Sequence, residues 1–354
     1  MKTQEGTMAG NKNVNPYLSI IVYSRNDDQY TRLRVCIDGI LAQAERHHLR
    51  SELILVEWNP PRDRPLIKDI FSWPKRLNFC SVRAIVVPAS IHLRYKYSDK
   101  CPVHHFAARN VGIRRARGEF VLSTTGDILF SNELMEYLAS ERLDKDVMYR
   151  VDRYDVKRDV ALLCSLDQQL AYCRKNILVV NRRLESGFFG STNVPYLHAN
   201  ASGDFLLLSK GRWHLLHGFP EIDVVGVHID GIMCYMAYLA GAKEEILLDP
   251  IRIYHIDHDS RWKKPEHNWL GTFFLRTVRP RRVARKLDWL SYKLFPPKSR
   301  LDLMGVPYLS YAQYKRIVLD MISGKRSIIY NDDSWGLGQD NLQEYLVTSA
   351  SWEK

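Results

Sequence analysis

Residues 109–127 read Arg109-Asn110-Val111-Gly112-Ile113-Arg114-Arg115-Ala116-Arg117-Gly118-Glu119-Phe120-Val121-Leu122-Ser123-Thr124-Thr125-Gly126-Asp127. This pattern predicts a helix, a glycine break, a buried strand over 120–123 and a carboxylate, Asp127, on the following loop. Ligands of open α/β sheets bind outside the carboxyl ends of the strands, so Asp127 is the first candidate for chemistry. Because the carboxylate of Asp127 lies among apolar residues, it needs a partner such as a metal ion, an arginine or backbone N–H groups. The alternative is a turn or a helix N-cap ahead of Ser131.

The segments around this stretch alternate between strand and helix patterns. Strands are predicted over 17–23, 52–57 and 84–88, and helices over 33–41 and 104–115. Such alternation is typical of right-handed crossovers and a mostly parallel sheet. Further along, we expect strands over 147–156, 205–208 and 251–254, a helix over 229–239 and irregular structure over 157–201.

Composition indicates a globular protein of enzyme size. The chain has 354 residues, of which 45% are hydrophobic, and no apolar run is long enough to span a bilayer. Residues 1–16 are polar, so we expect a disordered tail without a signal peptide, and a cytoplasmic location. Six cysteines without a C-x-x-C pair favour reduced, buried thiols. A net charge of +11 favours anionic partners.

Four further acidic or histidine side chains fall where strands or loops end: Glu57, Asp230, His255 and His258. Their recurrence at such positions indicates a shared crevice. Mg²⁺ and Mn²⁺ prefer carboxylate and phosphate oxygens, and Mn²⁺ also accepts imidazole. Asp127 with a late histidine could hold such an ion against a diphosphate. Alternatively, Glu57 is an exposed acid and the histidines bond to backbone.

Asp230 precedes a predicted helix and could be its N-cap or a catalytic base at the mouth of the crevice. Before it come Gly203 and Asp204, a strand, and then Trp213, followed by Gly218-Phe219-Pro220-Glu221. Apolar rings flanked by polar groups suit the faces of sugars. Trp213 could equally belong to the core.

Over residues 17–260 the chain resembles GT-A-type glycosyltransferases, and is similar to glycosyltransferase family 2. Each matching element is weak alone, whereas their order and spacing together are fairly specific. They are 18–22 followed by Asn26, the strand ending at Glu57, the run 109–119, the Asp127 loop, 203–204 leading to Trp213 and 218–221, and Asp230.

The resemblance implies a Rossmann-like, mostly parallel sheet with helices on both faces, and transfer of a sugar from a nucleotide diphosphate donor to a hydroxyl acceptor, with a divalent Mn²⁺ or Mg²⁺ ion. Asp127 matches the last acid of the family's D-x-D motif and His255 its late metal ligand, with His258 as the near alternative. Asp230 matches the base of inverting members. The remaining assignments are Ser24, Arg25, Asn26, Glu57, Arg109, Asn110 and Asp127 for the donor, and Gly203, Asp204 and Trp213 for the acceptor.

Two positions depart from the family pattern and keep an alternative open. Thr125 stands where the first acid of D-x-D is expected, and Ile229 precedes Asp230 in place of glutamate. The alternative is a catalytically inactive GT-A fold that binds a glycan or a nucleotide. A nucleotidyltransferase lacks support because no glycine-rich phosphate loop follows the first strand.

We expect three parts along the chain: the tail 1–16, a GT-A domain over 17–260 and a helical, basic C-terminal extension over 261–354. Within the domain, 17–130 is the nucleotide-sugar half and 131–260 the acceptor half. Segment 276–294 is basic and amphipathic, which favours peripheral membrane contact near a glycan or lipid-linked acceptor. The alternative is that its apolar residues pack on the domain. It lacks aromatic residues within its charged part, so no nucleic-acid partner is expected.

Overall fold

The computed structural model describes residues 15–27, 30–183, 194–224, 228–258, 268–296, 298, 302–303 and 305–353. Most of the expected tail 1–16 lies outside these residues. The chain forms two compact units, one from residues 1–257 with 309–354 and the other from 258–308.

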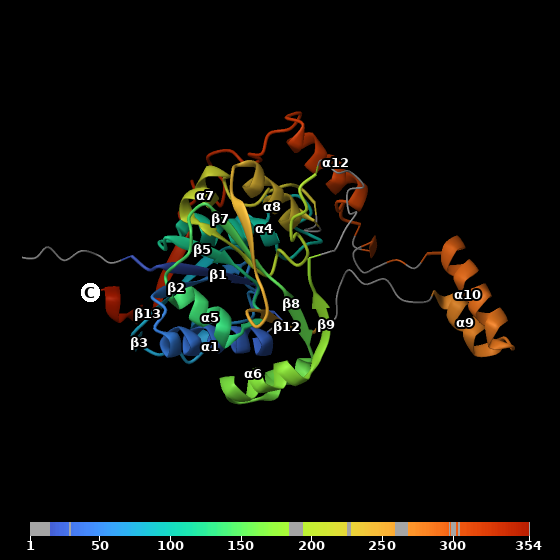
Figure 1. Ribbon diagram of the computed structural model, residues 1–354, viewed down its shortest axis with the longest axis horizontal. Helices are drawn as coiled ribbons and strands as arrows, with labels where there is room; N and C mark the ends of the chain where they lie inside the picture. The colour runs from blue at the N-terminus through green and yellow to red at the C-terminus, as the bar shows by residue number, and fades with distance from the viewer. Residues whose placement is uncertain are drawn as a thin grey trace, which may run out of the picture. The chain divides into compact units, whose positions relative to one another are not determined.

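The first unit is built on a nine-stranded, mainly parallel sheet (Figure 1). Its four central strands run parallel to one another, and the strand that flanks them on each side runs antiparallel to them. The expected α/β class with a mostly parallel sheet is confirmed. In spatial order the strands are β11 (Lys243–Leu247), β7 (Val147–Val151), β10 (Leu206–Ser209), β5 (Phe120–Ser123), β1 (Leu18–Ser24), β2 (Ser51–Trp58), β4 (Cys80–Val87), β13 (Gln343–Ala350) and β3 (Arg76–Leu77).

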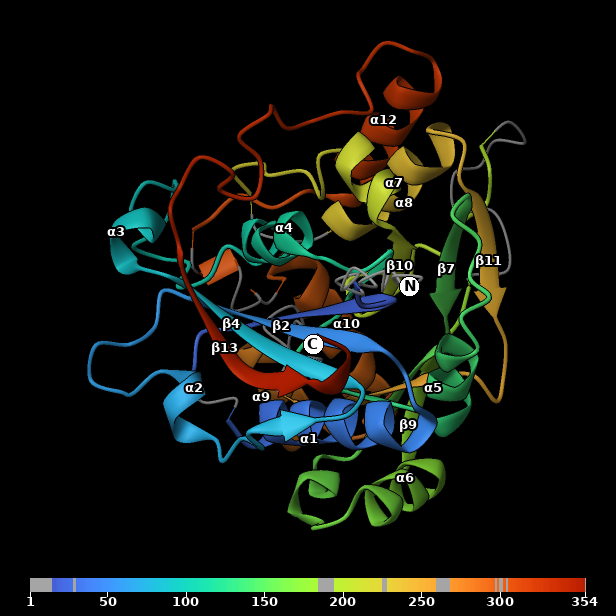
Figure 2. The same cartoon turned by 90° about the vertical axis from the view of Figure 1, so that its left-hand side faces the viewer.

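Helices cover both faces of this sheet (Figure 2). Successive residues of β1 point to opposite faces, so Ile20 and Val22 pack with one set of helices and Ile21 with the other. The first set comprises α1 (Tyr30–His47) and α5 (Asn132–Ala139); the second comprises α4 (His105–Arg115), α7 (Lys210–Leu215), α8 (Ile229–Leu239) and α12 (Tyr311–Ile322). Burial on both faces explains the continuous apolar runs of the central strands.

A second sheet has four strands: β6 (Ile128–Phe130), β12 (Ile253–Ile256), β8 (Arg153–Val156) and β9 (Ile177–Asn181). The single strand predicted over 147–156 is wrong, because the chain leaves the main sheet at Asp152 and enters the smaller one. The expected irregular region 157–201 contains the 3-10 helix η1 (Arg158–Leu162), helix α6 (Leu166–Lys175) and β9. Short helices α2 (Ile67–Ile70) and α3 (Ala89–His92) follow β2 and β4.

The chain end returns to the first unit and corrects the expected helical extension over 261–354. Strand β13 pairs with β4, and Tyr314 of α12 lies in the core. Arg83 of β4 forms ion pairs with both Glu52 and Glu344, which ties β13 to the sheet. The last described residues form the 3-10 helix η2 (Ser351–Glu353).

The second unit contains the helices α9 (Trp269–Thr277) and α10 (Arg281–Leu294), separated at Pro280. Within the described residues, each helix is too short or too polar to cross a membrane. All six cysteines lie within the described residues, and five of them are buried.

Candidate active site

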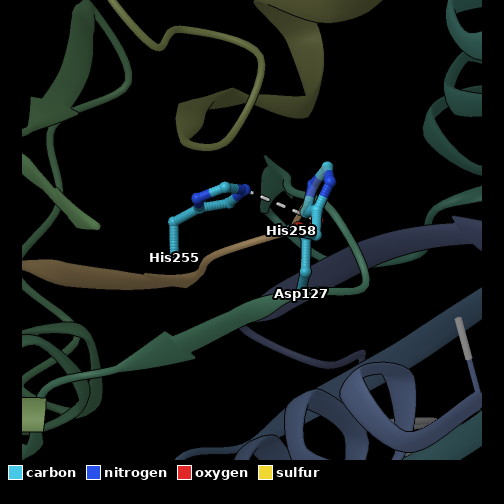
Figure 3. Close-up of side chains that lie close together, drawn as sticks. All are labelled: Asp127, His255 and His258. Atoms are coloured by element: carbon cyan, nitrogen blue, oxygen red, sulfur yellow. Dashed lines mark ion pairs between the residues drawn. The ribbon is translucent and has the colours of Figure 1, made fainter. Parts of the chain in front are cut away.

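Three side chains with metal-ligating atoms meet beside the smaller sheet (Figure 3). Asp127 precedes β6, His255 lies on β12, and His258 follows that strand; one ligand atom from each lies within 4.8 Å of the others. The His255 ring points toward Asp127, with Nε2 of the ring 3.6 Å from Oδ2 of the carboxylate. The antiparallel pairing of β12 with β6 places His255 opposite Ile128, directly after Asp127.

Asp155 holds the other ring nitrogen of His255. Its Oδ1 lies 3.1 Å from Nδ1, because the two residues face each other in the parallel pairing of β8 with β12. Burial lowers the pKa of His255, but hydrogen bonds to Asp127 and Asp155 outweigh burial and raise this pKa to about 10. In the metal-free chain the ring is thus a cation between two carboxylates.

Arg153 extends this group of charges toward Asp204. Its guanidinium Nε is 2.9 Å from Asp155, and its Nη1 donates to Asp204. Burial raises the pKa of Asp155, but His255 and Arg153 more than offset it and hold this pKa below its usual range. The chain Asp127–His255–Asp155–Arg153–Asp204 therefore alternates in sign, which lets several charged groups share a partly buried site.

Asp204 lies beside the loop that carries Asp127. It precedes β10, whose antiparallel pairing with β5 brings it to the carboxyl end of β5. Thr124 Oγ1 donates to the Asp204 carbonyl at 2.7 Å, and Thr125 Oγ1 lies 3.2 Å from the Asp204 carboxylate. Thr125, at the position where the D-x-D resemblance expects the first acid, thus has next to it a carboxylate from the segment that precedes β10.

Asp230 contacts the same region from the first turn of α8. Its Oδ2 accepts a hydrogen bond of 2.7 Å from the Gly203 N–H. The N-cap position of α8 is His228, so Asp230 is not the cap. A Cβ on Gly203 would lie 3.3 Å from Asp230 Oδ2 and 3.6 Å from Arg109 Nη2, so the side chains of Asp230 and Arg109 both lie close to the Gly203 backbone. Asp230 is half-buried.

Arg109 lies over the ends of the two central strands. Its Nη1 donates to Ser123 Oγ at 2.9 Å, and its guanidinium carbon lies 4.9 Å from the centre of the Tyr23 ring. These contacts fix a buried cation at the carboxyl ends of β1 and β5.

The first loop follows β1, as predicted. Ser24 Oγ accepts from the Asn26 N–H, and Asn26, which has a positive φ of 63°, donates to the Pro65 carbonyl. Arg25 donates to the Asn59 carbonyl at 3.0 Å. Side chains of this loop are thus held by the segment after β2, at the carboxyl ends of the parallel strands.

Glu57 is not the exposed acid of the alternative interpretation. Its side chain is only 1% exposed, and Oε2 accepts from the Ile67 N–H at 3.0 Å. Burial raises the pKa of Glu57 to about 7, although hydrogen bonds from Ile67 and Asn26 lower it. It links the first loop to α2.

Two of the residues predicted to contact a ligand have side chains that are fully buried and engaged in the fold. Asn110, assigned to the donor, is fully buried and bonds to both backbone groups of Phe219 and to Glu221. Trp213, assigned to the acceptor, is also fully buried, and its Nε1 donates to the Val121 carbonyl. Both residues hold the fold together around the site. Likewise, Asp127 does not cap α5, because Ser131 accepts the capping bond from Leu134.

Arg153 and Asp155 were not predicted as site residues. The alternation in 147–156 places them on the same side of a strand, two residues apart, and this was the available signal. Their contact with the site depends on the pairing of β8 with β12, and β12 lies about 100 residues later in the chain. No local sequence pattern specifies a pairing between strands so far apart.

No protein-family model matches the sequence, and no curated protein matches it. Among solved structures, the chain is similar to S. aureus TarS 1–349 in complex with UDP, with a TM-score of 0.43 and 13% identity over 79% of this chain and 72% of that one. Without UDP, TarS 1–349 gives a TM-score of 0.44 and 13% identity over 87% and 81% of the two chains. These values are low, and the chemistry of the site rests on its own side chains.

Proposed function

We propose that this protein is a glycosyltransferase that moves a hexosyl or pentosyl group from a nucleotide diphosphate sugar to a hydroxyl group. The observation that carries this proposal is the meeting of Asp127, His255 and His258 beside the carboxyl end of β5. The donor-side residues Arg109 and Ser24 lie at the ends of β5 and β1, where an open parallel sheet binds its ligands.

The ligand group fits Mn²⁺ better than Mg²⁺. It offers one carboxylate and two imidazole rings, and imidazole is acceptable to Mn²⁺ whereas Mg²⁺ prefers oxygen. Such an ion, when bound, supplies Lewis-acid stabilisation to a departing diphosphate. Asp155 would orient His255 as an outer partner, and a neutral His255 is required for ligation.

Asp230 is the residue that we assign as general base. Its carboxylate is held by the Gly203 N–H, close to Asp204, at the entrance that the acceptor hydroxyl would use. Removal of the hydroxyl proton by one base is sufficient for a single displacement, which inverts the anomeric centre. The acceptor is proposed to be a glycan, a polysaccharide or a lipid-linked sugar.

A panel of nucleotide sugars tests this proposal. With Mn²⁺, one donor should be hydrolysed slowly in the absence of acceptor, and the same donor should raise the melting temperature. Asp127→Ala should abolish the metal-dependent turnover. His255→Ala should weaken metal binding more than His258→Ala, because the His255 ring is held between the carboxylates of Asp127 and Asp155.

The second candidate is an inactive fold that binds a nucleotide or glycan. It is favoured by Thr125 in place of an acid and by the engagement of the neighbouring Asp204 with Arg153. Thermal stabilisation by a donor without hydrolysis or transfer, at any metal concentration, would favour this candidate over the enzyme. If no nucleotide sugar stabilises the protein or turns over, both candidates fail.

A further inference from the structure

The helices α9 and α10 lie side by side as a hairpin (Figure 1), and the contacts between them are small and polar. Asn268 Nδ2 donates to the Ser291 and Phe295 carbonyls at 2.8 Å each, and Ser291 Oγ donates to Asn268 Oδ1. Gly271 packs so closely on Asp288 that a Cβ there would collide with the carboxylate. The inner face of the hairpin thus buries few large apolar side chains.

Large apolar side chains lie on the outside instead. Trp269 and Phe273 of α9 are 79% and 55% exposed. On α10, Val283, Leu290 and Leu294 recur at spacings of seven and four residues, so they share one side of the helix, and all are exposed. A hairpin in water normally buries such residues between its helices, and an exposed apolar surface of this kind indicates a binding partner.

Charge decides which partner fits. Residues 269–294 contain seven basic side chains, Arg276, Arg279, Arg281, Arg282, Arg285, Lys286 and Lys293, against one acid, Asp288. The Lys293 ammonium lies 4.1 Å from the centre of the exposed Trp289 ring. Exposed aromatic rings beside a dense positive charge match the boundary of an anionic bilayer, where the rings enter the headgroup layer and the cations meet phosphates.

From these observations we propose that the α9–α10 hairpin binds the surface of an anionic lipid bilayer without spanning it. The proposal is independent of sugar transfer, because it concerns only the hairpin. It can be tested by co-sedimentation of the full chain with vesicles, in the absence of donor and acceptor. We expect binding to phosphatidylglycerol–phosphatidylcholine vesicles at low salt, weaker binding at high salt, and little binding to pure phosphatidylcholine vesicles.

The charge contribution is tested with Arg281→Gln, Arg282→Gln and Arg285→Gln in one variant. Three basic residues near an anionic surface should account for about 100-fold in vesicle affinity. The matched control, Arg316→Gln, Lys325→Gln and Arg326→Gln, removes three exposed positive charges outside the hairpin and should have a much smaller effect. Equal losses in the two variants, or no binding of the parent chain at low salt, would overturn the proposal.

The apolar contribution is tested with Leu290→Ser and Leu294→Ser together. Both side chains are largely exposed, so the variant should keep the parent's circular dichroism spectrum. We expect it to lose about 10-fold or more in vesicle affinity at all salt concentrations. If it binds vesicles like the parent but converts an oligomer into a monomer in sedimentation equilibrium, the surface is an interface between copies of this chain, and the bilayer proposal is wrong.

Discussion

At the scale of single residues, Asp155 orients the ring of His255. Replacing Asp155 should therefore weaken metal binding, although Asp155 is not itself one of the three proposed ligands. Its carboxylate bonds to Nδ1 of His255 and leaves Nε2 directed toward Asp127. Asp155→Asn should therefore weaken Mn²⁺ binding about 10- to 100-fold, which is typical of an outer partner of a ligating histidine. Titration calorimetry measures this change. The exposed Asp159→Asn serves as the control, and an equal loss there would point to a general charge effect.

His255 should also make the metal-free protein sensitive to alkaline pH. Its pKa rises from 6.5 to about 10 on folding, so the folded chain holds this proton more tightly. The resulting stabilisation is complete below pH 6.5 and is lost as the pH rises toward about 10. In EDTA, the melting temperature of the parent should fall across this range more steeply than that of His255→Gln. If the melting temperatures of the two proteins change with pH in parallel, the ion pairs of His255 contribute nothing to stability. The control is His48→Asn, at an exposed position, which should behave like the parent.

Asp230 is tested as a base by a substitution that preserves its shape. Asp230→Asn can still accept a hydrogen bond from Gly203 through its amide oxygen, but it cannot take a proton from the acceptor. Transfer should fall by about 100-fold or more, while donor affinity stays close to that of the parent. Comparing transfer rates with donor binding separates these effects. A product that retains the donor's anomeric configuration by NMR would exclude a single-base inverting scheme.

At the scale of elements, local patterns predicted the central strands and their helices but not the pairing of distant strands. The stretch 109–127 folds as α4, β5 and the Asp127 loop, because each segment has its own periodicity and a glycine at the break. By contrast, 147–156 alternates throughout, and nothing local shows that β7 and β8 join different sheets. Asp127 and His255 could be predicted as candidates; the partners Arg153 and Asp155 required the register of β8 with β12.

Helix α4 illustrates an element whose polar residue supports the fold. Asn110 makes three hydrogen bonds to the segment around Phe219, and Gly218 approaches it so closely that a Cβ would collide with its amide. Asn110→Ala would leave the buried Phe219 N–H unsatisfied and remove two further hydrogen bonds, so it should lower the free energy of unfolding by about 2 to 4 kcal/mol. Urea-induced unfolding measures this loss. Normal stability with weakened donor binding would instead restore the donor role that the burial of Asn110 argues against.

At the scale of the whole chain, the sequence placed a boundary near residue 260, and the structure places the return to the first unit at residue 309. Segment 261–354 was expected to form one helical extension because its part 276–294 is basic and amphipathic. Strand β13 has exposed glutamine and glutamate at its start, and it lacks the apolar run that marks a central strand. Its role depends on β4, more than 250 residues earlier in the chain, and this separation leaves no local signal.

The last prediction concerns this return. A chain ending at residue 308 would lose β13, exposing the edge of β4, and would lose Tyr314 and Trp335 from the core. It would also leave Arg115 without the carbonyls of Gly336 and Leu337 and without Glu344. Loss of one large buried aromatic side chain alone costs about 3 to 5 kcal/mol, so the truncated chain should fail to unfold cooperatively or should aggregate. A chain ending at residue 350 keeps all these contacts and should show the parent's urea transition; if the chain ending at 308 shows it too, residues 309–354 are an appendage after all.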